Sequence, residues 1–532
     1  MARPKLPTIT LDTTLTDLYR RAGPRYRDKK VAQVMCPVNS VIRLSKHIPR
    51  NEKYLYQDSV FNECSREDGT IDLSPQSERE WAMTYIALAP QRDAFLSGDT
   101  TVVMFYVSGD SEAQQAHDRE ETEKTMSVLP GAQKPKFVFC LGPGDIPVQE
   151  NEIDLLAYKL ASDALEGYDL TVPLNLGWYI NAKEALALSD LPTPRCELIK
   201  VEGHGNIPCC EICRKRESFV IPLGCTGERG RWFEKQSSRI IQKLSSHALP
   251  FVFKNQQAYG GAGTYIIRNE EDRAKLLQQQ KNGALRRLLS YINEHNQHLG
   301  PATIILSEYV ENEVGNYGLS FFVTEDADAP IFLAVTEQIL LHGKHYIGSS
   351  IQYDRQEGLK GKFGGLVKDM ARWYRRHGYV GPVGVDVLET ASSGSDGKHI
   401  RGEAGADMQN GEQDGSGEDP AVEIGKPKPK FHVLDLNART SGQLCLPLLR
   451  THFTSRGLDC AASFFMRILK RRDDFIKLFE REFETGKMCI LSWYDDPESE
   501  ISFGNVVIGA EDIERLAVWM QRIRGISEEV KF

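Results

Sequence analysis

The sequence lacks the segments that direct a chain into a membrane or out of the cell. No apolar run reaches the roughly 20 residues of a membrane-spanning helix. The start, MARPKLPTITLDTT, has no apolar signal core. The 11 cysteines are an odd number scattered over 532 residues, which indicates a reducing compartment and not a disulfide framework. We therefore expect a cytoplasmic protein.

Positive charge is also in short supply. The chain has 65 Lys and Arg against 74 Asp and Glu, a net charge of -9. This balance argues against nonspecific binding to nucleic acid or to anionic membranes, although it allows a local basic pocket. A hydrophobic content of 41% and a charged content of 26% are ordinary for a soluble globular protein. The composition therefore indicates neither a nucleic acid nor a membrane as a partner, and it leaves the oligomeric state open.

At 532 residues the chain is too long for one hydrophobic core, so we expect about three subdomains. Residues 1–175 alternate apolar, β-rich runs such as TVVMFYVSG with helix-like segments, among them NEIDLLAYKLASDALEGYD, which ends at Gly167. This alternation predicts an open α/β subdomain. Residues 451–532 are predicted to form a helical and stranded extension, in which LDCAASFFMRILKRRDDFIKLFEREFE is interpreted as one or two amphipathic helices.

Residues 391–430 differ in composition from the rest of the chain. They are rich in Gly, Ser, Asp and Glu and have almost no aromatic residues, so they cannot bury enough apolar surface to order themselves. We predict a long disordered acidic insertion in a hairpin turn. The turn would join two apolar strands, GPVGVDVLE and FHVLDLNARTSG.

Each of these two strands contains polar residues that a core would not select. Asp386 interrupts the first, and Asp435 and Asn437 alternate in the second, so that both side chains leave one face of the strand. Carboxylate and amide oxygens are suitable ligands for Mg²⁺, and Arg439 continues the same face with a planar fork for a phosphate or an acyl phosphate. The pattern predicts a nucleotide–metal site. For Asp386 alone, a cap of the following turn is the alternative.

A lysine and a glycine loop precede these strands. Lys254 ends the strand FVFK, and the loop YGGAGT follows, with Tyr259, Gly260, Gly261 and Gly263. A strand-end lysine and bare backbone N–H groups can bind phosphate oxygens, although such a loop is also the usual form of a hairpin turn. No Gly-Lys-Ser/Thr follows, so the loop is not a P-loop.

The order of these motifs resembles the ATP-grasp superfamily, and the resemblance covers about Trp178 to Arg450. It implies an α/β (α+β) fold in which the N-terminal open α/β subdomain is followed by a two-lobed ATP-grasp domain, residues 176–450, with the nucleotide between the lobes. It implies magnesium ligands at Asp386, Asp435 and Asn437, and catalytic roles for Arg439 and Lys254. The residues implied to bind the nucleotide are Lys183, Lys254, Tyr259, Gly260, Gly261, Gly263, Glu308, Val310, Asn316 and Lys344.

Some of these positions have alternatives. Glu313 rivals Asn316 as the contact to the ribose, because ENEVGNYG does not align cleanly with the family pattern. Lys183 lies on a predicted helix, where a solvated lysine is the ordinary finding. Residues 203–226 have no counterpart in the family pattern. This insertion contains Cys209, Cys210, Cys213 and Cys225 with His204 nearby, which suits either a structural zinc site or incidental thiols.

The resemblance implies a ligase that uses ATP and Mg²⁺ (or Mn²⁺) to activate a carboxylate as an acyl phosphate and joins it to an amine. Backbone N–H groups around Ser441 and Gly442 would stabilise the oxyanion, and no Ser, Cys or His nucleophile is needed. The insertions are similar to those of fungal ATP-grasp enzymes of secondary metabolism, which act on amino acids or small peptides. The alternatives are a nucleotide-binding scaffold of the same fold without ligase activity, and a ligase that forms acyl thioesters.

Overall fold

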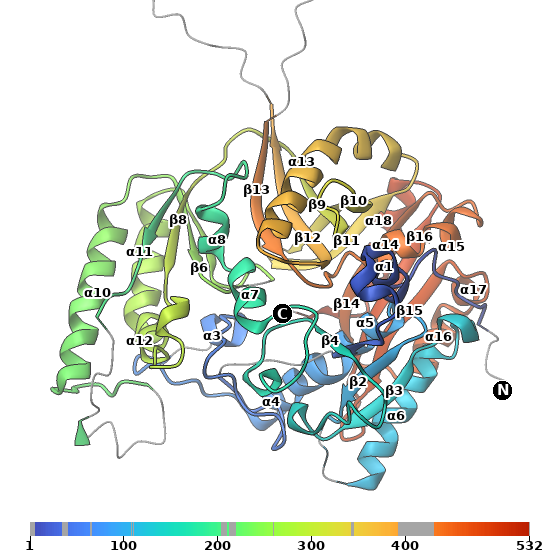
Figure 1. Cartoon of the computed structure of the whole chain (residues 1–532), viewed down its shortest axis with the longest axis horizontal. Helices are drawn as coiled ribbons and strands as arrows, with labels where there is room; N and C mark the ends of the chain where they lie inside the picture. Colours follow the sequence, from blue (N-terminus) through green and yellow to red (C-terminus); the bar gives the residue numbers. More distant parts are fainter. Residues whose placement is uncertain are drawn as a thin grey trace, which may run out of the picture.

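The computed structural model describes residues 6–34, 41–63, 66–107, 109, 111–203, 210–211, 220–258, 260–341, 345–391 and 430–530. Among these residues, no helix combines the length and the apolar character needed to cross a membrane. The described residues form three sheets, and the elements around them meet at the centre of the molecule (Figure 1).

The N-terminal subdomain is built on a parallel sheet. Within its described residues four strands lie in the order β3–β2–β1–β4, and each neighbouring pair is parallel. The strands are β1 (Val31–Val34), β2 (Thr101–Phe105), β3 (Lys136–Cys140) and β4 (Leu155–Tyr158). The helices are α1 (Leu15–Ala22), α2 (Pro24–Arg27), α3 (Ser59–Glu63), α4 (Pro75–Ala82), α5 (Ala89–Phe95) and α6 (Glu112–Met126), and the π-helical turn η1 (Met83–Leu88) joins α4 to α5. The 3₁₀ turns are η2 (Gly131–Gln133), η3 (Pro143–Asp145) and η4 (Asp163–Leu165).

A smaller lobe follows, drawn in green at the left of Figure 1. Its antiparallel sheet has the order β5–β8–β6–β7, from β5 (Cys196–Ile199), β6 (Phe251–Asn255), β7 (Thr264–Ile267) and β8 (Ile304–Glu308). Its helices and turns are α7 (Leu174–Ile180), α8 (Lys183–Ala187), α10 (Glu228–Ser246), α11 (Glu270–Gln279), η5 (Gln280–Ala284), α12 (Leu285–Ser290) and η6 (Gln297–Leu299). Helix α10 buries Trp232, Gln236, Ile240 and Leu244, a four-residue spacing that places all four on one face. That face packs on the sheet together with α11 and α12.

The largest sheet carries the second lobe and the C-terminal part of the chain. Its described strands lie in the order β13–β12–β9–β10–β11–β14–β16–β15, and β17 pairs with β14. They are β9 (Glu313–Val323), β10 (Ile331–Leu341), β11 (His345–Gln352), β12 (Gly381–Thr390), β13 (Lys430–Asn437), β14 (Cys460–Ile468), β15 (Met488–Asp495), β16 (Ser502–Ala510) and β17 (Glu528–Glu529). The helices are α13 (Gln356–Arg376), α14 (Cys445–Leu448), α15 (Arg450–Thr454), α16 (Arg472–Leu478), α17 (Glu480–Glu484) and α18 (Ile513–Arg524).

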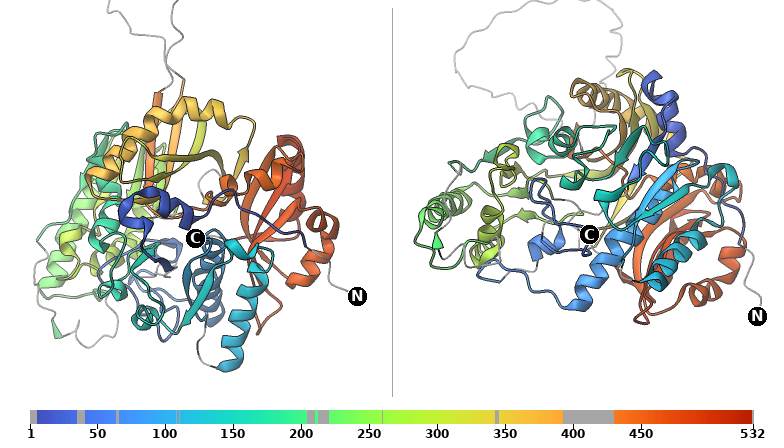
Figure 2. Two further views of the ribbon diagram at one scale, coloured as in Figure 1. Left: turned by 45° about the vertical axis from the view of Figure 1, so that its right-hand side comes forward. Right: turned by 60° about the horizontal axis from the view of Figure 1, so that its bottom comes forward.

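Pairing across the sheet unites segments that are far apart in sequence. Strand β14 pairs with β11 over five residues, so the C-terminal strands extend the sheet of the second lobe. Strand β15 lies beside α5 and α6 of the N-terminal subdomain, where the Tyr494 hydroxyl donates to the Asp118 carboxylate over 2.7 Å. Figure 2 shows the N-terminal elements and the C-terminal strands side by side in both views. The predicted fold class, an open α/β subdomain followed by a two-lobed α+β domain, is confirmed.

Two local predictions were wrong. The segment around Leu155 contains strand β4 and not an amphipathic helix, because its apolar residues pair with β1. Residues Cys460–Ile468 form strand β14, whose side chains are buried on both faces between β11 and β16, so its continuous apolar run does not indicate a helix.

Candidate functional site

A cavity of about 880 Å³ lies where the two lobes and the N-terminal subdomain meet. The small lobe contributes Lys254 and the glycine loop, and the large sheet contributes Asp386, Asp435 and Asn437. The N-terminal subdomain contributes Arg92 and Lys159. Residues that are far apart in the sequence therefore share one cavity; Arg92 and Arg439, for example, are 347 positions apart.

The acidic side chains of the cavity come from one hairpin. Strands β12 and β13 pair antiparallel from Gly384↔Asn437 to Thr390↔Lys430, and Asp386 lies directly opposite Asp435. The hairpin prediction for the segment around residues 391–430 agrees with this pairing, although residues 392–429 lie outside the described residues. Asp386 is in the middle of β12 and therefore does not cap a turn.

A β-bulge next to this pair exposes one backbone carbonyl. Asp386 pairs with Asp435 and Val387 pairs with Val433, so Leu434 has no partner across the ladder. The Leu434 carbonyl accepts a hydrogen bond from Lys254 Nζ at 3.0 Å. The bulge thus ties the carboxylate-bearing hairpin to the phosphate-lysine candidate of the other lobe.

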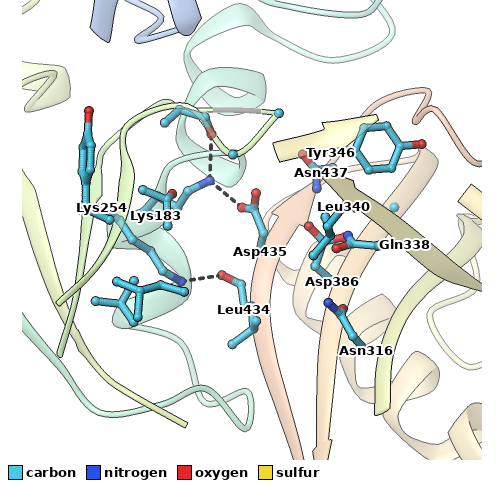
Figure 3. A pocket seen from close by; sticks show the side chains of 18 of the residues that line it. Lys183, Lys254, Asn316, Gln338, Leu340, Tyr346, Asp386, Leu434, Asp435 and Asn437 are labelled. Carbon is cyan, nitrogen blue, oxygen red and sulfur yellow. Dashed lines mark hydrogen bonds and ion pairs between the residues drawn. The ribbon is translucent and has the colours of Figure 1, made fainter. Parts of the chain in front are cut away.

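The two lysines lie on the side of the cavity opposite Asp386 (Figure 3). Lys254 belongs to β6, where Phe251, Phe253 and Asn255 are buried in the small-lobe core while Val252 and Lys254 line the cavity. Lys183 is the first residue of α8 and is only 7% exposed. Its Nζ lies 2.7 Å from Asp435 Oδ1 and 2.9 Å from the Ala258 carbonyl. Lys183 is therefore a buried, paired lysine and not a solvated one.

Burial sets the electrostatics of the cavity. Burial and, second, the charge of Asp435 raise the pKa of Asp386 to about 7, although Lys183, Arg439 and Lys254 act in the opposite direction. Burial and the neighbouring charge of Lys183 lower the pKa of Lys254. Like charges face each other on both sides of the cavity, which is destabilising unless opposite charge lies between them.

Beyond the carboxylates, β13 leads into a polar turn. Arg439 donates to Asn437 Oδ1 over 2.5 Å and to Asn181 Oδ1 over 2.7 Å, so two amides fix its guanidinium. Ser441 and Gly442 also line the cavity. A Cβ atom on Gly442 would lie 2.4 Å from the Tyr346 hydroxyl, and one on Gly384 would lie 2.8 Å from Ser441 Cβ. Glycine at both positions lets the turn approach its neighbours closely.

The opposite end of the cavity contains the predicted hinge. Glu308 ends β8, and Val310 follows it beside Tyr309 in the cavity wall. Asn316 and Glu313, the two candidates for the ribose contact, both line the cavity from β9. The buried Asn316 Oδ1 has no hydrogen-bond partner within the described part of the chain, so it is the better placed of the two to accept from a ligand.

Several predicted residues do not join this arrangement. Gly260 and Gly261 line the cavity, whereas a Cβ atom on Gly263 would point at Asn255 and Asn62. Gly263 therefore serves the turn between β6 and β7, and its φ of 65° requires glycine there. Tyr259 and Lys344 lie outside the described residues.

The zinc hypothesis can be followed only in part. Cys209, Cys213 and His204 lie outside the described residues. The sulfur atoms of Cys210 and Cys225 are 3.4 Å apart. Among the described residues there is no group of three or more His, Cys, Asp or Glu side chains arranged to hold a metal ion.

Sequence reasoning missed other residues of the cavity. Gln338 of β10 donates to Asp386 Oδ1 over 2.6 Å, and it lies in the strand from which Lys344 was selected. Gln338 and Leu340 alternate on the cavity face, and this period-two pattern is the signal that could have identified them. Arg92 and Lys159 come from the N-terminal subdomain, where no motif marked them.

The similarity of the chain to known proteins is distant. No protein-family model matches the chain, and no curated protein sequence matches it. Among solved structures, it is similar to N5-carboxyaminoimidazole ribonucleotide synthetase from Thermus thermophilus, with 12% identity, 84% of this chain and 98% of that chain covered, and a TM-score of 0.44. It is also similar to biotin carboxylase from Campylobacter jejuni, with 9% identity, 94% of this chain and 92% of that chain covered, and a TM-score of 0.43. For L-amino acid ligase from Bacillus licheniformis the identity is 9%, the coverage is 95% of this chain and 99% of that chain, and the TM-score is 0.41.

At these identities and TM-scores, the similarities say nothing of the activity of this chain. The motifs of the chain itself are more informative, because the two lysines, the acidic hairpin and the arginine occur in the expected order and meet between two lobes. This two-lobed α+β architecture is the one expected from the order of the motifs in the sequence.

Proposed function

We propose that the protein is an ATP-grasp enzyme, a ligase that uses ATP and Mg²⁺ to activate a carboxylate as an acyl phosphate and joins it to an amine. The observation that carries the proposal is the constellation of Lys183, Lys254, Asp386, Asp435 and Arg439 around one cavity between the lobes. The proposed substrates are amino acids or small peptides of secondary metabolism, as the sequence resemblance implies. The proposed location is the cytoplasm, as the scattered cysteines indicate.

The cavity has a suitable lining for a nucleotide along its length. Ile266, Leu340 and Leu388 offer apolar walls for the adenine beside the hinge at Glu308 and Val310. Asn316 would accept from a ribose hydroxyl. Lys183, Lys254 and the backbone of Gly260 and Gly261 would bind the phosphates.

The residues present fit a divalent cation. Two carboxylates face each other across one ladder, and the pKa of Asp386 is raised. The raised pKa has burial as its first cause and the Asp435 charge as its second, and an ion with oxygen ligands would offset both effects. Asn437 adds an amide oxygen on the same face of β13. Asp386, Asp435 and Asn437 would hold Mg²⁺ or Mn²⁺, which supplies charge neutralisation for the transferred phosphoryl group.

The side chains of this chain would then act on the substrates. Arg439, fixed by Asn437 and Asn181, would orient the carboxylate so that one of its oxygens attacks the terminal phosphorus and ADP leaves. The amine nitrogen would next attack the acyl carbon of the acyl phosphate. N–H groups around Ser441 and Gly442, with Arg439, would stabilise the tetrahedral oxyanion, which expels phosphate and leaves the amide. A proton leaves the nitrogen in the same step.

The test is an ADP-release screen with pairs of amino acids, followed by mass spectrometry of the products. The proposal predicts that certain pairs stimulate ADP formation and yield one equivalent of dipeptide or amide per ADP. ATP binding without stimulated ADP formation by any pair would instead indicate a non-catalytic scaffold. Product formed only with thiol acceptors would replace amide synthesis with thioester synthesis.

A further inference from the structure

A pair of cations, the buried Arg92 and the partly exposed Lys159, lines the cavity near the turn that follows β13. Arg92 of α5 and Lys159, which follows β4, share one carboxylate, that of Asp93. Arg92 Nε and one terminal nitrogen lie 2.8 and 2.5 Å from Asp93 Oδ1, and Lys159 Nζ lies 2.6 Å from Oδ2. Asp93 is fully buried, and Arg92 is 3% exposed. Both cations line the cavity.

This group of three has a surplus of one positive charge. Burial lowers the pKa of Lys159 to about 8, followed by the charge of Arg92, while Asp93 acts in the opposite direction and Arg439 adds a further lowering. The single negative charge of Asp93 therefore does not neutralise the two positive charges of Arg92 and Lys159. A buried cationic site of this kind is stabilised when a monoanion enters it.

The pair also has hydrogen-bond donors to spare. A guanidinium carries five N–H donors and an ammonium carries three. In the described part of the chain, Arg92 and Lys159 direct their hydrogen bonds only to the two oxygens of Asp93. Because both side chains line the cavity, their remaining donors can reach a ligand there.

The pair is adjacent to the reacting centre but separate from it. Thr440 Oγ1 donates to Asp93 Oδ2 over 2.8 Å, and Thr440 is the neighbour of Arg439 in the chain. A donor carboxylate that is to be phosphorylated must lie at Arg439 beside the phosphates. A carboxylate at Arg92 and Lys159 therefore belongs to the partner that approaches from the other side.

An apolar wall flanks the cation pair. Tyr85, Ala89, Pro90 and Leu160 line the same end of the cavity, and Phe465 packs against the Arg92 guanidinium at 5.3 Å from the ring centre. A ligand here meets positive charge at one point and apolar surface around it. This combination suits an amino acid with an apolar or aromatic side chain.

We propose, on the basis of the ligase function above, that the amine substrate carries a carboxylate and that Arg92 and Lys159 bind it. The acceptor is then an α-amino acid, or a small peptide held by its terminal carboxylate, with an apolar side chain. Thr440 links this binding site to Arg439 through Asp93.

The test compares L-amino acids with their α-carboxamides as acceptors in the ADP-release assay. The variant is Lys159→Met, and the matched control is Lys29→Met, which removes an exposed lysine that pairs with Asp154 of the same subdomain. The wild-type enzyme should prefer the amino acid over its amide. Lys159→Met should raise the KM for the amino acid by about 10- to 100-fold, the usual effect of losing a charged hydrogen bond. Its KM for the amide and for ATP should stay at the wild-type values.

A structural role of Lys159 would affect both acceptors equally, so equal losses for amino acid and amide would overturn the inference. Amides that serve as well as amino acids in the wild-type enzyme would also overturn it. If no pair of substrates stimulates ADP release, the ligase proposal fails separately. Calorimetric titration with the same L-amino acids and amides, in the presence of a non-hydrolysable ATP analogue and Mg²⁺, still tests the carboxylate site, because only the amino acids should bind and Lys159→Met should abolish that difference.

Discussion

Asp435→Asn separates the proposed metal chemistry from the stability of the fold. The substitution keeps the shape of the side chain and removes one of the two carboxylates that face each other in the β12–β13 hairpin. Lys183 Nζ, 2.7 Å from Asp435 Oδ1, can still donate to the amide oxygen and to the Ala258 carbonyl. A neutral hydrogen bond is worth about 1 kcal/mol less than a charged one, and relief of the repulsion on Asp386 is of similar size and opposite sign. The apparent Tm should therefore change by no more than about 3 °C.

The effect on catalysis should be much larger. Loss of one charge-stabilising group in an active site typically lowers the rate by about 10²- to 10³-fold. Weaker metal binding should also raise the Mg²⁺ concentration at half-maximal rate by at least about tenfold. The assay is substrate-stimulated ADP release over a Mg²⁺ titration, with Asp190→Asn as the control, since Asp190 is an exposed carboxylate paired with Arg376. Near-normal turnover at low Mg²⁺ by a folded Asp435→Asn protein would refute the metal assignment.

Three other expectations follow from the same structure. Lys254→Met should raise the Kd for ATP by about 10- to 100-fold, because a charged hydrogen bond to phosphate is lost. The Tm should not fall, since burial and the Lys183 charge already disfavour the ammonium form of Lys254. Wild-type affinity in a calorimetric titration would contradict this prediction. The pKa of Lys159 is about 8 in the folded protein and 10.5 for the unperturbed group, so the unfolded chain binds more protons between these values and stability rises with pH across that window, by at most about 3 kcal/mol. The Tm of the wild-type protein relative to Lys159→Met should increase from pH 7 to about pH 9.5, and a constant difference would exclude the linkage. Replacing residues 392–429 by Asn-Gly should leave the ADP-release rate within about twofold, since β12 and β13 pair as far as Thr390↔Lys430; a large loss would show that the segment contributes to the site.

The sequence predicted the parts of the site that depend on short-range geometry. Alternation in a strand places Asp435 and Asn437 on one face, and both line the cavity in the structure. The bulge at Leu434 could not be predicted, because it depends on how β13 is paired with β12. The cations of the further inference, Arg92 and Lys159, lie on α5 and after β4 and meet only through tertiary packing.

The errors in the fold have a similar origin. Strand β14 was mistaken for a helix because a continuous apolar run has no periodicity, and the charged helix α16 follows it closely. The position of β14 inside the sheet is decided by its pairing with β11 and β16, and its faces are covered by other elements such as α14 and α18. The strand β4 was missed for the same reason, since only its pairing with β1 distinguishes it from a helix.

The β12–β13 hairpin also has a consequence for the order in which ligands could bind. Asp386, Asp435 and Asn437 keep their mutual spacing through one ladder, independently of any hinge motion, whereas Lys183 and Lys254 approach them from the opposite wall. A metal ion could therefore bind to the hairpin before the lobes close. A polyphosphate that contacts both the metal ion and the two lysines would then hold the lobes together. Release of ADP would require the lobes to separate again, so we expect product release to limit the rate of turnover.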